Sequence, residues 1–132
     1  MVEEAWPYVK DFIEIAVKQT DGRYTLEDAY KMVSDQGYLL WAALGEDGIK
    51  GAIITCFLTY PRKKSLHIMF LGGTQGHDWK AQFLKTMRKF ARDQGCSAIE
   101  ASGREGWSRM LKADGFKPLW HTFEIPIELG VH

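Results

Sequence analysis

The sequence predicts one α+β domain, because helical and strand-like patterns alternate along a chain of 132 residues. Near the amino terminus, and again around residues 78–94, apolar residues recur at the spacing of amphipathic helices. Between these segments lie short runs rich in β-branched and aromatic residues, separated by turn-forming residues, which indicates strands. The length matches the commonest size of a single domain, so we expect one domain that spans residues 1–132.

Two helices are predicted before the first strand. Within residues 6–18 the apolar side chains share one face, and Pro7 suits the first helical turn. Thr25 and Asp28 form a variant of the capping box, which predicts the start of a second helix, and Gly37 predicts its end. The amino-terminal part of the chain is therefore expected to be helical.

Three antiparallel strands are predicted next. They span residues 38–44, 49–60 and 65–71, with turns between them at residues 45–48 and 61–64. In the third strand a period of two would place Leu66, Ile68 and Phe70 on one face. The central part of the chain is therefore expected to form a meander.

The remaining elements complete the order ααβββαβαβ. They are a long helix at about residues 78–94, a strand at 98–101, a helix at 105–113 and a last strand that follows Gly115 and Phe116 and runs through Ile125. A strand, a helix and a strand in succession form a crossover, which makes the third and fourth strands parallel. The prediction is a mixed, mainly antiparallel sheet flanked by helices.

Charge and cysteine content exclude several kinds of partner and site. Lysine plus arginine equals aspartate plus glutamate at 17 each, so no net field draws the protein to nucleic acid or to an anionic membrane. Cys56 and Cys96 lack a CxxC spacing, and we expect buried thiols. No histidine pair has metal-ligand spacing, so no metal is expected. The chain shows neither a signal peptide nor an apolar run of about 20 residues, which predicts a cytoplasmic protein.

The element order and one segment resemble a known family. The segment contains a Gly-Arg-x-Gly-Trp stretch at residues 103–107, followed by Gly115 and Phe116. Together they resemble the GCN5-related N-acetyltransferase (GNAT) fold, and in particular small GNAT-like proteins encoded by bacteriophages and prophages. The resemblance covers nearly the whole chain. It implies, if the protein is active, transfer of an acyl group from acetyl-CoA to an amine acceptor.

The resemblance also implies a cofactor loop between the third strand and the long helix. In catalytic GNAT proteins a Gln/Arg-x-x-Gly-x-Gly/Ala loop directs backbone amides at the coenzyme A pyrophosphate. The candidate cofactor-binding residues here are Leu71, Gly72, Gly73, Thr74, Gln75, Gly76 and Arg104. The family spacing is not met, because Gly76 directly follows Gln75, and Asp78 adds a negative charge. Alternatively, the glycines only form a turn, Asp78 caps the helix, and Arg104 ties its own loop to backbone carbonyls or to Glu100.

His67 and Glu100 are the candidate catalytic residues. His67 should point away from its apolar neighbours on the third strand, and Glu100 lies on the neighbouring strand. GNAT enzymes commonly take a carboxylate or histidine base from these strands, so the resemblance implies that this pair deprotonates an amine. The alternative is a surface histidine and a Glu100 paired with a cation such as Arg104. Leu111 stands where many GNAT enzymes have a tyrosine that protonates the leaving thiolate, and leucine cannot do so.

The residues leave two main functions open. The first is an acyl-CoA-dependent N-acyltransferase with a degenerate cofactor loop. The second is a non-catalytic GNAT-fold virion structural or assembly protein, which would bind phage proteins or its own copies through exposed aromatic residues such as Trp120 with Phe123 or Trp6 with Tyr8. A regulator that binds coenzyme A without turnover is a third reading. All three fit the host cytoplasm, and the second also fits incorporation into a virion.

Overall fold

The computed structural model describes residues 2–74, 77–102, 112, 115–120 and 122–127. Two compact units, residues 1–102 and 103–132, make up the chain, and each is considered by itself. All the elements named below belong to the first unit. Within the described residues, every helix is too short or too polar to cross a membrane.

Two helices form an amino-terminal layer, α1 (Val2–Lys18) and α2 (Leu26–Asp35). The predicted capping box at the start of α2 is confirmed. The Asp28 N–H donates to Thr25 Oγ1 over 3.1 Å, and the Thr25 N–H donates to the Asp28 carboxylate over 2.9 Å. The box satisfies two backbone donors that the helix itself leaves without partners. It therefore fixes where the chain enters α2.

Four strands form one mixed sheet in the order β1-β2-β3-β4. Their bounds are β1 (Leu39–Gly45), β2 (Gly48–Tyr60), β3 (Lys63–Gly73) and β4 (Ala98–Ala101). β1, β2 and β3 pair antiparallel, whereas β4 pairs parallel with β3. The predicted mixed, mainly antiparallel sheet is confirmed.

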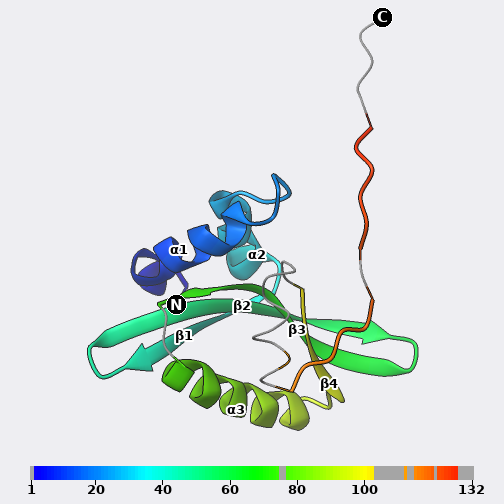
Figure 1. Cartoon of the computed structure of the whole chain (residues 1–132). Helices are drawn as coiled ribbons and strands as arrows, with labels where there is room; N and C mark the ends of the chain where they lie inside the picture. Colours follow the sequence, from blue (N-terminus) through cyan, green and yellow to red (C-terminus); the bar gives the residue numbers. More distant parts are fainter. Residues whose placement is uncertain (1, 75–76, 103–111, 113–114, 121, 128–132) are drawn as a thin grey trace, which may run out of the picture. The chain divides into compact units, whose positions relative to one another are not determined.

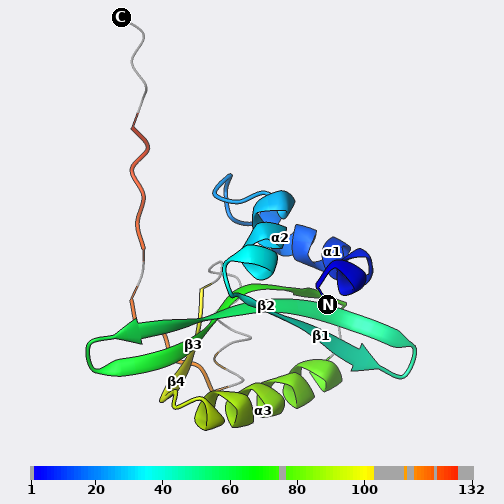
Figure 2. The ribbon, with the colours of Figure 1, turned by 180° about the vertical axis from the view of Figure 1, so that it is seen from behind.

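Helices cover both faces of this sheet. α3 (His77–Asp93) connects β3 to β4 and crosses one face, while α1 and α2 lie on the other (Figures 1 and 2). A crossover helix between two parallel strands must pass over one face, which leaves the opposite face to the amino-terminal helices. The first unit thus has three layers.

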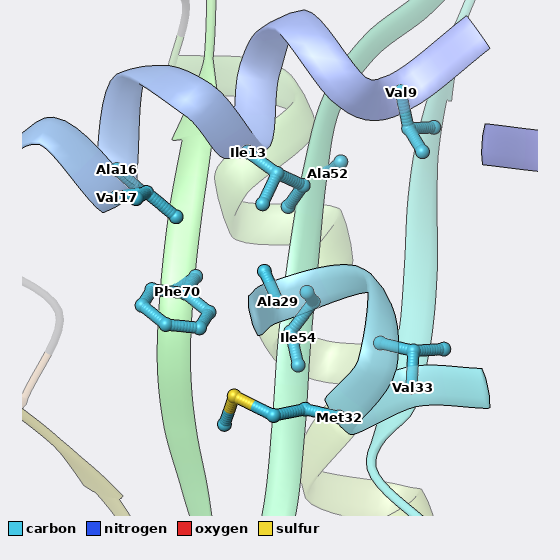
Figure 3. Packing of buried hydrophobic residues seen from close by; sticks show 10 residues of the cluster. All are labelled: Val9, Ile13, Ala16, Val17, Ala29, Met32, Val33, Ala52, Ile54 and Phe70. Atoms are coloured by element: carbon cyan, nitrogen blue, oxygen red, sulfur yellow. The ribbon is translucent and has the colours of Figure 1, made fainter. Parts of the chain in front are cut away.

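The core between the amino-terminal helices and the sheet is built from small and branched apolar side chains. Figure 3 shows Val9, Ile13, Ala16, Val17, Ala29, Met32, Val33, Ala52, Ile54 and Phe70. Ile13 of α1 and Ile54 of β2 have no exposed surface. The cluster fixes which side of β2 and β3 faces α1 and α2, and the candidate site lies on that same side.

A bulge in β3 divides its apolar residues between the two faces. Consecutive residues of β2 lie opposite Ile68 and Phe70, so Met69 is an extra residue on β3. One extra residue turns every following side chain to the other face. Phe70 therefore joins the core under α1, and the prediction that it shares a face with Leu66 and Ile68 is wrong.

The face covered by α3 is aromatic. Trp41 of β1 packs edge-on against Phe83 and Phe90 of α3, and Phe57 of β2 stacks on Phe90. The Trp41 indole N–H donates to the buried Thr55 hydroxyl over 2.9 Å. The Trp41 indole N–H and the Thr55 hydroxyl are thus paired with each other, and the aromatic rings pack together as a core.

The second unit differs from the prediction at the last strand. Among its described residues, 116–120 and 122–127 carry no strand assignment. A strand needs a hydrogen-bonded neighbour as well as an apolar pattern, and Pro118 and Pro126 lack the N–H that a ladder uses. The predicted helix at 105–113 lies outside the described residues except for Lys112, which is helical.

Candidate functional site

Three polar side chains from neighbouring strands lie in a row on the face of the sheet that carries α1 and α2. Cys56 of β2 lies opposite His67 of β3, and His67 lies opposite Glu100 of β4. Cross-strand partners project from the same face, and Cys56 shares its face with Ile54, two residues earlier, in the core. We call Cys56, His67 and Glu100 the polar row. The strand pairing brings together the two residues predicted as catalytic, His67 and Glu100.

Two tyrosines hold the ends of the polar row. The Tyr60 hydroxyl donates to Glu100 Oε2 over 2.8 Å. This bond raises the pKa of Tyr60, because the neutral phenol is the form that donates. At the other end, burial and the neighbouring Cys56 raise the pKa of Tyr38. Glu100 is therefore fixed by a hydrogen bond, and Cys56 lies beside Tyr38.

His67, in the middle, is held less completely. Its Nε2 lies 3.5 Å from Ser102 Oγ, whereas its Nδ1 is buried and has no hydrogen-bond partner among the described residues. Burial lowers the pKa of His67 below the ordinary 6.5, and the nearby Glu100 charge opposes that shift. His67 is therefore a neutral imidazole at neutral pH.

This arrangement suits proton transfer from a substrate. A neutral imidazole accepts a proton, and the Glu100 carboxylate beside it stabilises the imidazolium that forms. Cys56 has a different character, because burial raises the pKa of its thiol and disfavours the nucleophilic thiolate. Of the polar row, His67 is the residue suited to act as a base.

The polar row lies beside the point where β3 and β4 part. The parallel ladder joins four residue pairs and ends with Ile68 opposite Ala101. β3 continues to Gly73, so residues 69–73 lack a strand neighbour on that side within the described chain. An unpaired strand edge presents N–H and C=O groups to a ligand. His67 thus lies two residues before the part of β3 that has no described strand neighbour on this side.

The predicted cofactor residues fall into two groups. Leu71, Gly72 and Gly73 end β3 and Thr74 follows them, whereas Gln75, Gly76 and Arg104 lie outside the described residues. Leu71 is half-buried. The residues of the polar row and those of the predicted cofactor loop therefore meet on one strand, β3.

Both glycines at the end of β3 are required by packing. A side-chain carbon at Gly72 would overlap the Phe12 carbonyl oxygen of α1, so the helix backbone rests directly on the strand. A side-chain carbon at Gly73 would come within 2.6 Å of the Trp79 ring of α3. Each glycine thus permits the close approach of one helix layer.

Thr74 is likewise engaged in the fold. Its N–H donates to the Lys50 carbonyl over 2.8 Å, and its hydroxyl donates to the same oxygen over 3.3 Å. Its own carbonyl accepts from the Trp79 indole N–H over 3.0 Å. Thr74 therefore ties the end of β3 to β2 and to α3.

A hollow of about 350 Å³ lies between α2 and the chain on either side of it. Tyr24, Lys31, Met32 and Tyr38 are among its lining residues. Tyr38 also contacts Cys56, so it is shared between this hollow and the polar row. The hollow offers aromatic, apolar and charged groups at one end of the row.

Sequence reasoning missed Tyr38, Cys56, Tyr60 and Ser102 as neighbours of the predicted pair. The length of the turn after Tyr60 determines the strand register, and this register places Cys56. Tyr60 lies opposite Lys63, and four steps back along β2 bring Cys56 opposite His67. The predicted turn at residues 61–64 was two residues too long to give that register. No sequence signal identifies Ser102.

Comparisons with known proteins identify the fold. No protein-family model and no curated protein matches the chain. Among solved structures, a tetramutant of a Bacillus halodurans protein has a TM-score of 0.72 and 14% identity, covering 94% of this chain and 95% of that chain.

Two structures named as acetyltransferases are also similar. A ribosomal-protein-alanine N-acetyltransferase from Brucella melitensis has a TM-score of 0.66 and 12% identity, over 96% of this chain and 92% of its own. An aminoglycoside acetyltransferase from an uncultured soil metagenomic sample has a TM-score of 0.64 and 13% identity, over 96% and 94%. At such identities the likeness establishes the fold alone. The chain therefore has a GNAT fold and is acetyltransferase-like in structure.

Proposed function

We propose that the chain is a phage-type, acyl-CoA-dependent N-acyltransferase with a degenerate cofactor loop. The observation that carries the proposal is the polar row, in which a neutral His67 lies between Cys56 and Glu100 beside the open edge of β3. The GNAT fold supports it as well, although one fold hosts many functions. His67 is the proposed base, and Glu100 is the residue that stabilises its charged form.

In the proposed acyl transfer, one bond forms, one bond breaks and one proton is moved at each end. The acceptor nitrogen forms a bond to the acyl carbon, while the bond between that carbon and the thioester sulfur breaks. His67 Nε2 takes the proton that the nitrogen loses, and Glu100 stabilises the resulting imidazolium. The leaving thiolate takes a proton from solvent, because Leu111 has none to give. A thiol has an ordinary pKa of about 8.5, so the thiolate leaves readily near neutral pH.

The thioester substrate would lie along the end of β3. The arm of coenzyme A carries two amides. The backbone groups of residues 69–73, which have no strand neighbour on that side among the described residues, would hydrogen-bond to them as a strand does. Residues 71–76 and Arg104 would hold the pyrophosphate. The fit is partial, because Thr74 already uses its N–H and hydroxyl on Lys50.

The amine acceptor, a small molecule or a protein amine, would enter from the hollow beside α2. Tyr38 lines this hollow and touches Cys56, and Cys56 lies next to His67 in the polar row. The acidic and basic groups around the hollow, Asp28 and Lys31 among them, would favour a polar acceptor.

Calorimetry and an acetylation assay test the proposal together. We expect acetyl-CoA to bind the wild-type protein, and some member of an amine panel to be acetylated. His67→Gln should bind acetyl-CoA with unchanged affinity and lose turnover, because the thioester would contact β3 and not the imidazole. The absence of binding heat at millimolar acetyl-CoA would exclude the enzyme and the coenzyme A regulator alike.

A second candidate is a non-catalytic GNAT-fold virion structural or assembly protein. The specific observation in its favour is that Gly72, Gly73 and Thr74 serve packing and internal hydrogen bonds. Trp120 is 67% exposed and Phe123 89% exposed, which suits an interface with a phage protein or another copy. Failure to bind acetyl-CoA, together with co-purification with virions, would support this candidate.

Of the other predicted aromatic pair, only one member is exposed. Trp6 packs edge-on against Tyr30 with ring centroids 5.2 Å apart, whereas Tyr8 is 71% exposed. A contact through this pair would therefore depend on Tyr8. Under both candidates we expect a protein made in the host cytoplasm, with partners other than nucleic acid or membrane.

A further inference from the structure

The two helix layers of the first unit differ in charge. Residues 2–35, which form α1, α2 and the chain between them, include eight acidic and four basic residues, whereas α3 includes five basic and two acidic ones. The sheet separates the two layers (Figures 1 and 2). The net charge of zero therefore conceals an acidic layer and a basic layer on opposite sides of the sheet.

One stripe of α1 points away from the core. Glu4, Tyr8, Asp11 and Ile15 are exposed, and their spacing of four, three and four residues keeps them on one side of a helix. Tyr8 is 71% exposed and Ile15 is 52% exposed, and within the described helices these are the exposed large apolar side chains. We call these four residues the acidic stripe. Carboxylates that alternate with apolar side chains suit a partner with both basic and apolar groups.

α3 presents a stripe with the same spacing on the other side of the sheet. Ala81, Lys85, Arg88 and Arg92 are exposed and follow one another at four, three and four residues. We call these four residues the basic stripe. The salt bridges within α1 and within α3 join other residues of these helices, so they leave the charges of both stripes in place.

The two stripes match when they are aligned antiparallel. The pairs are then Glu4 with Arg92, Tyr8 with Arg88, Asp11 with Lys85, and Ile15 with Ala81. Two of these pairs are ionic, one places a guanidinium on an aromatic ring, and one is apolar. The parallel alignment would instead place Ile15 against Arg92. Each stripe spans about 16 Å, a length over which two helices that cross at about 20° remain in contact.

We propose that copies of this protein stack on one another, with the acidic stripe of one copy docked antiparallel on the basic stripe of the next. A second copy is the partner because both halves of the contact occur in one chain at the same spacing. The stripes lie on opposite sides of each copy, so the contact is head to tail and each added copy offers a stripe to the next one. Neither stripe includes a residue of the polar row, so stacking is independent of acyl transfer.

Sedimentation velocity of the full chain tests the stacking. At low ionic strength we expect species larger than a dimer that grow with protein concentration, and a monomer at about 1 M salt, where the Debye length is about 3 Å. Asp11→Lys and Lys85→Asp each place like charges across the contact, and each should raise the dissociation constant at least about tenfold. An equal mixture of the two variants should associate like the wild type, because each variant then meets an opposite charge at both of its stripes.

Two further variants separate the contact from the effect of net charge. Asp47→Lys and Lys63→Asp make the same changes of charge at exposed positions outside α1 and α3, and they should associate like the wild type. A wild type that stays monomeric at about 1 mM and low salt would overturn the proposal. So would a mixture of Asp11→Lys and Lys85→Asp that associates no better than either variant alone. A dimer that does not grow with concentration would overturn the head-to-tail arrangement.

Discussion

The middle and the end of β3 use their polar and small residues in opposite ways. At the end, Gly72 and Gly73 admit the two helix layers, and Thr74 spends its polar groups on Lys50 and Trp79. In the middle, His67 keeps a buried nitrogen without a partner among the described residues. The two described glycines of the predicted cofactor loop, Gly72 and Gly73, thus have a role in packing. The proposed chemistry belongs to the incompletely paired histidine.

The largest expected effect is on catalysis at the middle of β3. His67→Gln should lower kcat/KM for acyl transfer by about 10²- to 10⁴-fold, because a glutamine amide cannot act as a base. The thermal unfolding midpoint should stay close to wild type. Acetylation rates measured beside melting curves check both points. A variant that keeps more than about a tenth of the activity would remove His67 from the mechanism.

At the end of the strand the largest effect should be on stability. Gly72→Ala forces a methyl group against the Phe12 backbone, which we expect to cost about 3 kcal/mol in the free energy of unfolding. Gly45→Ala is the matched control, since its methyl group meets only the flexible Lys50 side chain and should change stability by less than about 1 kcal/mol. Urea denaturation measures both. Equal, small losses would show that Gly72 is not needed for packing.

The next effect concerns the influence of the Glu100 charge on the pKa of His67. Its charge raises the pKa of His67, so Glu100→Gln should move that pKa further below 6.5 and lower kcat about tenfold. Tyr60→Phe is the control, because it removes the hydrogen bond to Glu100 and keeps the carboxylate charge. An NMR titration of His67 in the free variants distinguishes the two. An unchanged or raised pKa in Glu100→Gln is the contrary result.

The smallest effect concerns stability and pH. The pKa of His67 is lower in the folded protein than its ordinary 6.5, so below that pH the unfolded chain binds more protons. The contribution of His67 to the free energy of unfolding is therefore fully present above pH 6.5. It is lost as the pH falls through the pKa of His67 in the folded protein. His67→Gln should flatten the slope of unfolding free energy against pH in that window. Denaturation curves at several pH values measure it, and an equal slope in both proteins would refute the expected linkage.

Much of the first unit was predictable because its local signals agree. The capping box at Thr25 and Asp28, the strand at 98–101 and the parallel pairing of β3 with β4 were all expected from the sequence. Helical periodicity, capping residues and turn residues act over a few positions, so they are visible in the chain itself. The GNAT-like order follows from them.

The errors, and the features that the sequence did not reveal, arose where a long-range contact decides the result. The bulge at Met69 depends on how β3 pairs with β2, and it places Phe70 on the face opposite to the predicted one. The overlap of a Gly72 side chain with Phe12 depends on how α1 crosses the strand. The last predicted strand had the apolar pattern but lacks a partner strand among the described residues. None of these contacts is encoded in a local pattern.

The pH dependence of kcat/KM, measured for the wild type and for His67→Gln, decides most directly whether His67 is the base. We expect an acid limb in the wild type with a pKa below 6.5, and no such limb in the residual activity of the variant. A limb that persists unchanged in His67→Gln would contradict it. So would a wild-type protein that acetylates no amine at any pH.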